Sequence, residues 1–408
     1  MNKQTLLKKR ILILSVGVFT MLFSGVLYAW SILKVPFKEL FGWSDKLLAL
    51  NFTATMCFFC LGAFFGSLLC KRCGVRVSLL LSGGLVGVGF AATAFLTAAT
   101  PYLLFLTYAV LAGGGIGICY NVVVSTICAW FPDKKGFCSG CLMMGFGIST
   151  LLLGNVIDTL FGMERFGMKN TYLAVAAVLA AVLIAAAFLI QLPPKEAEFP
   201  APKAAKAAKK EAFETRDFTT KEMLCTFTFW RAFVLMTLIT AVGNSVISFA
   251  RDLMLSVEAS ASLATTLVGV LAVFNGIGRV VTGIVYDGLG RRTTMLLSNL
   301  VTIVAAGITL LAVTLGSLPL CIAGLCLTGI SYGSCPTLTS AFSASFYGQK
   351  HFAVNYSITN FNLILASFIA TLANTLLIST GGFTAPFILL LALALLALGL
   401  NFTIKKPE

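Results

Sequence analysis

Arg279 is the residue of this sequence that is best placed to do chemistry inside an apolar stretch. It lies in an apolar run that begins near Ser262, and Asn275 precedes it by one helical turn. An arginine in a membrane-spanning helix costs about 2.5–3.5 kcal/mol on insertion scales, so it is rarely retained without a use. Its planar guanidinium can hold a carboxylate through two parallel hydrogen bonds. We therefore predict that Arg279 binds an organic anion, and that Asn275 either adds a second polar contact or satisfies Arg279 at rest.

The alternative for Arg279 is an ion pair with a carboxylate on a neighbouring helix. No aspartate or glutamate lies deep in an apolar run, because Asp158 and Glu258 fall near run ends. Other polar or aromatic residues near the middle of a run could orient a carboxylate or could simply pack between helices, and these are Tyr28, Trp30, Tyr120, Asn121 and Tyr332. Helix position alone adds Asn244, Met143 and Met144 as weaker candidates, whereas Lys34 is expected to reach the membrane interface.

The composition indicates the elements that must position these residues. Of the 408 residues, 58% are hydrophobic and 11% are charged, whereas a soluble protein has about 25% charged residues. Apolar runs near 20 residues long can each cross a hydrocarbon core about 30 Å thick. A membrane β-barrel would instead show segments of about 10 residues with alternating polarity. We predict an all-α integral membrane protein with twelve transmembrane helices, at residues 11–33, 46–69, 77–98, 102–130, 137–160, 171–192, 230–254, 262–286, 293–315, 319–344, 351–377 and 383–403.

The only long polar stretch divides the runs into two sets of six. We predict an N-terminal six-helix bundle at 1–192, a cytoplasmic linker at 193–229 and a C-terminal six-helix bundle at 230–408. The linker is rich in proline, alanine and lysine, which indicates a solvated tether, and contact with anionic lipid heads is an open alternative. Two parallel repeats joined by a long loop are typical of transporters whose substrate site lies between the halves.

The net charge of +14 follows the membrane topology. Lysine and arginine gather in alternate loops, in the linker and at both ends of the chain, which predicts that both termini are cytoplasmic. The plasma membrane is the location that we expect for the protein. Because no basic patch stands outside this pattern, we expect no nucleic-acid partner.

A glycine-rich basic turn follows the second run of the second half, with Gly283, Asp287, Gly290, Arg291 and Arg292. This turn resembles the loop signature of the major facilitator superfamily, and the resemblance implies the major facilitator fold and a gating role for the five residues. The matching turn of the first half, residues 67–76, departs from the signature because Lys71 stands where the family has aspartate.

A narrower resemblance rests on residues 25–31 (GVLYAWS), 41–44 (FGWS) and 275–279 (NGIGR). These segments are similar to the oxalate/formate antiporter and bacterial monocarboxylate transporter family, which implies that Arg279 binds the substrate carboxylate. The oxalate antiporter meets the second carboxylate with a lysine in span eleven. Here that span has Asn360, Phe361 and Asn362 instead. One buried cation matches one carboxylate, so the departure favours lactate, pyruvate or formate over oxalate.

We expect secondary active transport of a small monocarboxylate by alternating access, coupled to a proton and performed by a monomer. An anion exchanger of the oxalate/formate type is the alternative, and a transporter-fold sensor of organic acids or a carrier of sugars or drugs is less favoured. The sequence implies no cofactor and shows no ATP-binding P-loop.

Three further patterns have simpler interpretations. Gly329-Ile-Ser331-Tyr-Gly333 matches the G-x-S-x-G elbow of hydrolases, but we expect a helix there, so no enzymatic activity is predicted. The pairs Cys70/Cys73 and Cys138/Cys141 could bind zinc, yet no histidine has ligand spacing. The apolar run after Arg10 is too long for a signal peptide and is predicted to be the first span.

Overall fold

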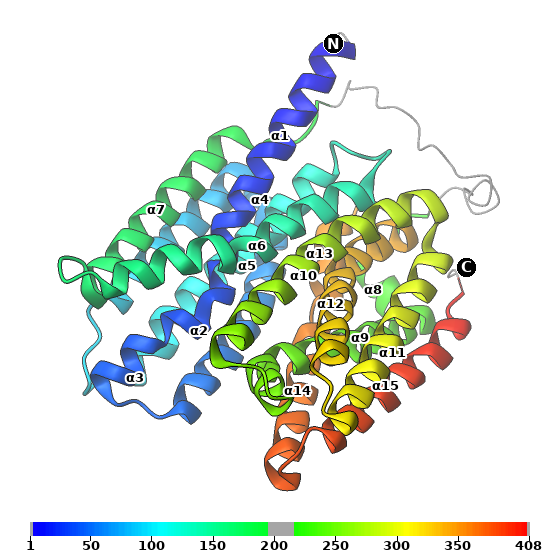
Figure 1. Ribbon diagram of the computed structural model, residues 1–408. Coiled ribbons are helices and arrows are strands. Elements are labelled where there is room, and N and C mark those ends of the chain that lie inside the picture. The colour runs from blue at the N-terminus through cyan, green and yellow to red at the C-terminus, as the bar shows by residue number, and fades with distance from the viewer. Residues whose placement is uncertain (1–2, 195–215, 406–408) are drawn as a thin grey trace. The chain divides into compact units, whose positions relative to one another are not determined.

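The computed structural model describes residues 3–194 and 216–405, which are largely helical (Figure 1). Most of the predicted linker, residues 195–215, lies outside the described residues, as do residues 1–2 and 406–408. Eleven helical stretches of the described part are long and apolar enough to cross a membrane. The predicted all-α class is therefore confirmed.

The helix α4 (Asp45–Thr93) explains why eleven stretches correspond to twelve predicted spans. Its 49 residues join the predicted spans 46–69 and 77–98. At 1.5 Å per residue, α4 would extend about 74 Å, more than twice a hydrocarbon core of about 30 Å. Gly74 interrupts it with φ 83° and ψ 172°, a conformation that only glycine adopts without strain. α4 thus supplies two spans, which bears out the predicted twelve.

The chain forms two compact units, each described here by itself. The described residues of unit 1 are 3–133 and 145–194, and those of unit 2 are 134–144 and 216–405. Unit 2 thus includes the first turns of α6 (Lys135–Gly162). The division of the chain at 192 and 230 stays a prediction.

Unit 1 contains the helices of the first half. Its elements are α1 (Lys3–Ser24), the 3₁₀ helix η1 (Gly25–Ala29), α2 (Trp30–Leu33), α3 (Val35–Phe41), α4, the π-helix η2 (Phe105–Gly113), α5 (Gly114–Cys128), the remainder of α6 and α7 (Gly167–Leu189). The turn after α2 is fixed from two sides. Tyr172 donates its hydroxyl hydrogen bond to the Leu33 carbonyl at 2.7 Å, and Trp30 Nε1 donates to the Leu48 carbonyl at 3.1 Å.

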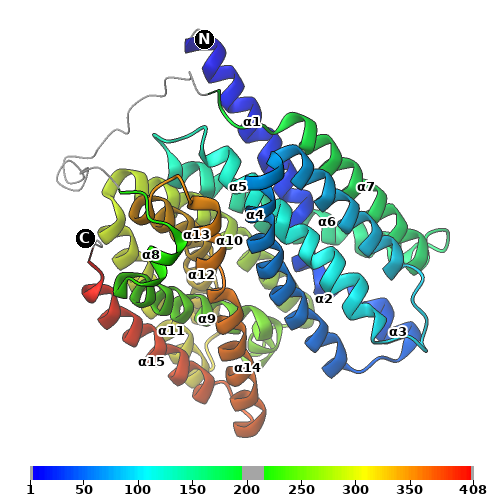
Figure 2. The ribbon, with the colours of Figure 1, turned by 180° about the vertical axis from the view of Figure 1, so that it is seen from behind.

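Unit 2 contains the helices of the second half together with the first turns of α6. Its further elements are α8 (Thr220–Leu224), α9 (Phe227–Ser256), α10 (Ala261–Leu289), α11 (Arg291–Leu315), α12 (Leu318–Tyr347), α13 (Phe352–Thr359), α14 (Asn362–Thr380) and α15 (Thr384–Thr403). In both views α11 and α15 lie side by side at one edge of this unit (Figures 1 and 2). Phe249 and Phe387 belong to one apolar core among the described residues of the unit, and Phe229 and Phe342 belong to a second.

The last described residues of the predicted linker form an ordered segment on unit 2. Thr219 caps α8 and forms a reciprocal capping box with Glu222. Phe218 is buried, and its carbonyl accepts a hydrogen bond from Asn355 Nδ2 at 3.0 Å. Figure 2 shows α8 beside α13. Phe218 and Thr220 are thus attached to Asn355 of α13, whereas the sequence predicts a solvated tether over residues 193–229.

Candidate functional site

Arg279 lies in α10 and is 3% exposed. Its Nε donates a hydrogen bond to Asn275 Oδ1 at 3.1 Å, and Nη1 donates to the carbonyl of Met143, in the part of α6 that belongs to unit 2. Thr337, on α12, donates its hydroxyl to the Arg279 carbonyl at 3.2 Å. The helix therefore places Asn275 on the same face as Arg279, one turn earlier, as the sequence predicts.

All acceptors of the Arg279 guanidinium are neutral. A guanidinium has five N–H donors, and Nη2 of Arg279 donates to no described residue. Arg10 is the other buried charged side chain among the residues whose burial is described, and it forms an ion pair with Asp133. Arg279 forms no ion pair within the described residues. It is therefore a buried cation whose charge is not neutralised by the described part of the chain.

Close backbone contacts fix the position of Arg279 in unit 2. A Cβ added to Gly333 of α12 would lie 2.1 Å from the Asn275 carbonyl oxygen and 3.1 Å from the backbone nitrogen of Arg279. A Cβ at Gly140 of α6 would lie 2.6 Å from the Arg279 carbonyl oxygen. Small residues let helix backbones approach closely in membrane proteins. The glycines thus let α6 and α12 approach α10 at the level of the guanidinium.

The turn predicted to act in gating holds the start of α6. Asp287 accepts hydrogen bonds from the backbone N–H of Gly136 at 3.0 Å (Oδ1) and of Phe137 at 2.8 Å (Oδ2). A carboxylate is favoured at a helix N-terminus because the first N–H groups lack helical acceptors and the dipole is positive there. A Cβ at Gly283 would lie 2.2 Å from the Gly136 carbonyl oxygen, so this glycine permits the contact.

The remaining residues of that turn have separate positions. Gly290 has φ 79° and ψ 175°, and it ends α10 and precedes α11. The guanidinium of Arg291 lies 4.4 Å above the ring of Phe346, and Arg292 is exposed. The dihedral angles of Gly290 nearly repeat those of Gly74, so the two turns share a backbone although Lys71 replaces the aspartate of the first.

The candidates of spans ten and eleven also lie in unit 2. Tyr332 is 6% exposed and packs on Gly243 of α9, where a Cβ would lie 2.5 Å from the tyrosine Cβ. Asn360 and Asn362 are each 2% exposed, and Phe361 is half-buried. Residues 360 and 361 separate α13 from α14, so the predicted span 351–377 is a broken helix at the position of these candidates.

Two aromatic candidates of the first half, Tyr28 and Tyr120, contact the same ring in unit 1, whereas Trp30 contacts Tyr108. Tyr28 and Tyr120 contact Phe146 with ring centroids at 5.4 Å and 5.1 Å, and Phe59 lies 5.1 Å from Tyr120. Asn121, the residue after Tyr120, is fully buried. The structure therefore brings Tyr28 and Tyr120 together within unit 1, and Arg279 and Asn275 together within unit 2.

The weaker patterns have structural positions of their own. Ser331 lies inside the helix α12 and not on a strand-to-helix turn, and its hydroxyl is 2.5 Å from the Thr302 hydroxyl. His351 precedes α13. Cys70 and Cys73 lie one turn apart in α4, and the described residues contain no cluster of metal ligands that joins them to Cys138 and Cys141.

Sequence reasoning did not identify Thr337 or the Gly136 and Gly140 contacts. The four-residue spacing of Gly136 and Gly140 is a small-residue pattern that indicates close helix approach, so it could have drawn attention to the start of α6. The contact of Met143 with Arg279 uses a backbone carbonyl, which every residue has, so no side-chain pattern predicts it.

Comparisons with known proteins agree with this architecture. The chain matches the Major Facilitator Superfamily over residues 12–361 and 233–408. It is 26% identical over 346 residues to an oxalate:formate antiporter of Oxalobacter formigenes, covering 85% of this chain and 79% of the relative. It is 23% identical over 380 residues to monocarboxylate transporter 12 of Rattus norvegicus, covering 88% of this chain and 77% of the relative.

Solved structures share the fold at low identity. A proton:xylose symporter superposes with a TM-score of 0.72 at 14% identity, covering 99% of this chain and 97% of the other. The fucose:proton symporter of E. coli superposes with a TM-score of 0.69 at 13% identity, covering 98% and 100%. The matched residues span nearly all of the sequence, and the helices carry the same architecture. The chain thus belongs to the Major Facilitator Superfamily and is a multi-pass membrane transporter.

Proposed function

We propose that this transporter carries a small monocarboxylate of the lactate, pyruvate or formate type by alternating access, together with a proton. The observation that supports the proposal is the uncompensated charge of Arg279, which is 3% exposed and hydrogen-bonded only to neutral acceptors among the described residues. A substrate carboxylate would supply the missing negative charge and could engage Nη2 together with Nη1.

Asn275 has a positioning role in this proposal. Its Oδ1 holds Nε, which orients the guanidinium plane and leaves the opposite edge for the carboxylate. The buried asparagines Asn360 and Asn362 replace the second cation that a dicarboxylate would need, which favours one carboxylate per substrate. Tyr28, Tyr120, Asn121, Tyr332 and Phe361 are proposed as further substrate-contacting residues.

The proposed proton coupling rests on the net charge of the transported species. A carboxylate that crosses with a proton carries no net charge, so the transported pair does not work against the membrane potential. Asp158 in α6 and Asp252 in α9 each lie four residues before the C-terminal end of their helix, and Glu258 follows α9. We therefore propose that the proton travels with the anion and not through a dedicated carboxylate relay.

Gating is assigned to the turn at Asp287. Its two hydrogen bonds to the start of α6 are proposed to break and re-form in each transport cycle, with Gly283 permitting the close approach and Gly290 the sharp turn. Arg291 and Arg292 complete this turn. The same proposal places both termini in the cytoplasm, the protein in the plasma membrane and a monomer as the working unit.

Proteoliposome uptake of radiolabelled L-lactate, with and without an imposed pH gradient, tests the proposal. Wild type and Arg251→Ala should both show gradient-driven uptake, because Arg251 is an exposed arginine of α9 and a matched control for the loss of charge. Arg279→Ala should abolish the uptake. Arg279→Lys should restore little of it, because an ammonium lacks the planar fork. Uptake by Arg279→Ala at the wild-type rate would refute the assignment.

Anion exchange is the second candidate, because the relative from Oxalobacter formigenes is an oxalate:formate antiporter. Exchange predicts that labelled substrate enters only vesicles loaded with formate or oxalate and that an imposed pH gradient has no effect. Symport predicts entry into empty vesicles when the outside is acidic. The same vesicles measured in both ways therefore separate the two mechanisms.

A further inference from the structure

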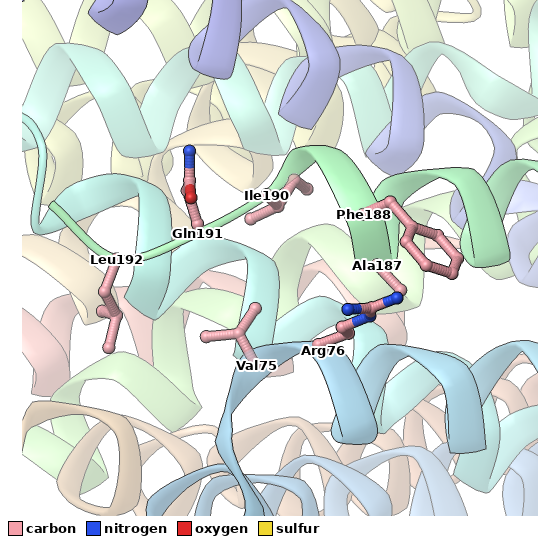
Figure 3. A pocket seen from close by; sticks show the side chains of 7 residues that line it. All are labelled: Val75, Arg76, Ala187, Phe188, Ile190, Gln191 and Leu192. Atoms are coloured by element: carbon pink, nitrogen blue, oxygen red, sulfur yellow. The ribbon is translucent and has the colours of Figure 1, made fainter.

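A pocket of about 320 Å³ lies in unit 1, where α7 ends and the second half of α4 begins (Figure 3). Its volume is at the lower end of the range for small-molecule sites, about 300–1,000 Å³. The residues that line it are Val75, Arg76, Ala187, Phe188, Ile190, Gln191 and Leu192. None of these residues takes part in the site around Arg279, so the pocket is a separate feature of the fold.

Arg76 gives the pocket its charge. Its guanidinium lies 4.2 Å above the ring of Phe188, a cation–π contact that leaves the N–H edges free to bind an anion. Arg76 has no hydrogen bond or ion pair with any described residue. In contrast, Arg10 of the same unit is bound to Asp133. The pocket therefore presents a guanidinium that is held by a ring and is paired with no carboxylate of the described residues.

The rim of the pocket is fixed by the surrounding chain. Gly74 breaks α4, so a new first helical turn begins at Val75 beside Arg76. On the other side, α7 ends at Leu189 and Ile190 is extended with ψ 119°. The fully buried Trp130 donates from Nε1 to the Gln191 carbonyl at 2.7 Å, which secures this extended segment. The lining is thus built from the start of the second half of α4, the end of α7 and the extended segment that follows α7.

The surface beside the pocket is apolar and open. Phe188 is 57% exposed and Leu192 is 59% exposed, and on α4 Val77 and Leu81 are also exposed, one turn apart. A Cβ added to Gly84, on the next turn, would meet no atom within 4 Å, so the helix leaves room beside it. Exposed apolar side chains on a membrane helix face acyl chains. A ligand that fits both the pocket around Arg76 and the apolar surface beside it carries an anionic head and hydrocarbon tails.

We propose that this pocket binds the phosphodiester headgroup of an anionic glycerophospholipid, with Arg76 on the phosphate and the acyl chains along Val77, Leu81 and Phe188. Guanidinium groups bind phosphate oxygens in pairs, and basic pockets between helices on the cytoplasmic side of membrane proteins hold lipid heads. Inorganic phosphate could bind Arg76 as the phosphodiester of a headgroup does, but it would gain nothing from the apolar surface. The lipid is therefore the occupant that the geometry favours.

Lipid titration followed by native mass spectrometry of the whole protein in detergent tests this proposal. Arg76→Gln is compared with Arg72→Gln, because Arg72 is exposed, lies before the break of α4 at Gly74 and does not line the pocket. Wild type and Arg72→Gln should retain one phosphatidylglycerol with equal affinity. Arg76→Gln should bind it at least tenfold more weakly, which is about 1.4 kcal/mol. Phosphatidylcholine, which has no net negative charge, should bind weakly to all three.

Other results would overturn the proposal. Equal weakening by Arg76→Gln and Arg72→Gln would mean diffuse attraction to a basic surface. Displacement of the lipid by equimolar inorganic phosphate would mean a site for the free anion. Phe188→Leu keeps the apolar wall but removes the ring under the guanidinium, so it should weaken phosphatidylglycerol binding while the thermal unfolding midpoint stays at the wild-type value. Unchanged binding by Phe188→Leu and Arg76→Gln would refute the site.

Discussion

Replacing Gly333 by alanine should strongly reduce transport although no charged residue is substituted. The added Cβ would lie 2.1 Å from the Asn275 carbonyl oxygen, which is 1.3 Å short of the 3.4 Å at which ordinary contact begins. Because the obstacle is backbone, α12 and α10 must separate by about 1 Å at this level, at an overpacking cost of about 1–3 kcal/mol. A displacement of about 1 Å at a binding residue reduces a rate by about 10²-fold. Since Arg279 follows Asn275 by one turn, we expect its guanidinium to move with α10.

The measurement is the initial rate of lactate uptake into proteoliposomes at equal amounts of inserted protein. Gly307→Ala is the matched control, because Gly307 lies inside the neighbouring helix α11 and an added Cβ there meets no atom within 4 Å. Gly307→Ala should transport like wild type and be slightly more stable, since alanine is the better helix former. If Gly333→Ala also transports like wild type, the close packing of α10 and α12 does not position Arg279, and the reasoning is wrong.

Three further predictions follow from contacts in the two units. Asn275→Ala removes the acceptor of Arg279 Nε and should raise the KM for lactate more than it lowers the maximal rate. The loss of a hydrogen bond to a charged group costs about 1.5–3 kcal/mol. Uptake measured over a series of lactate concentrations separates the two effects. Asp133→Ala removes the carboxylate that pairs with the buried Arg10 and should lower the free energy of unfolding by about 3–5 kcal/mol in chemical denaturation. The double variant Arg10→Met, Asp133→Leu should recover most of this loss. Hydrogen bonds from the backbone N–H and hydroxyl of Thr219 hold the pKa of Glu222 below its usual 4.5. The ionised Glu222 therefore stabilises the fold above pH 4.5, and this stabilisation is lost as the pH falls through the lowered pKa. Glu222→Gln should lack this acid-dependent loss when unfolding midpoints are compared across acidic pH.

Hydropathy predicts the spans well because it reports what the hydrocarbon core requires. The predicted spans 293–315 and 383–403 correspond to α11 (Arg291–Leu315) and α15 (Thr384–Thr403), and charged or turn-forming residues mark both ends. The same reasoning predicts that Asn275 and Arg279 share a helix face, because the helical period alone determines it.

The irregular backbone could not be predicted in this way. The π-helix at 105–113, the 3₁₀ helix at 25–29 and the break at 360–361 all lie inside runs that read as continuous helix. These departures depend on contacts between helices that are distant in sequence. A Cβ at Gly25, for example, would lie 2.1 Å from the Phe146 carbonyl oxygen, so η1 passes directly against α6. The sequence shows the glycine at position 25 but not that Phe146 lies against it in the fold.

Neutral partners suit the function proposed for Arg279 better than a resident carboxylate would. A carboxylate such as the Asp133 that binds Arg10 would compete with the substrate for the same guanidinium, and removing either charge from a buried pair costs about 3–5 kcal/mol. A hydrogen bond to a charged group from a neutral partner contributes about 1.5–3 kcal/mol, so Asn275 and the Met143 carbonyl can hold the guanidinium in place without cancelling its charge. An arriving carboxylate then gains the full electrostatic attraction, and its departure leaves a cation that is still hydrogen-bonded. This balance suits the reversible loading that the proposed function needs, because a fixed ion pair would have to break before the substrate could bind.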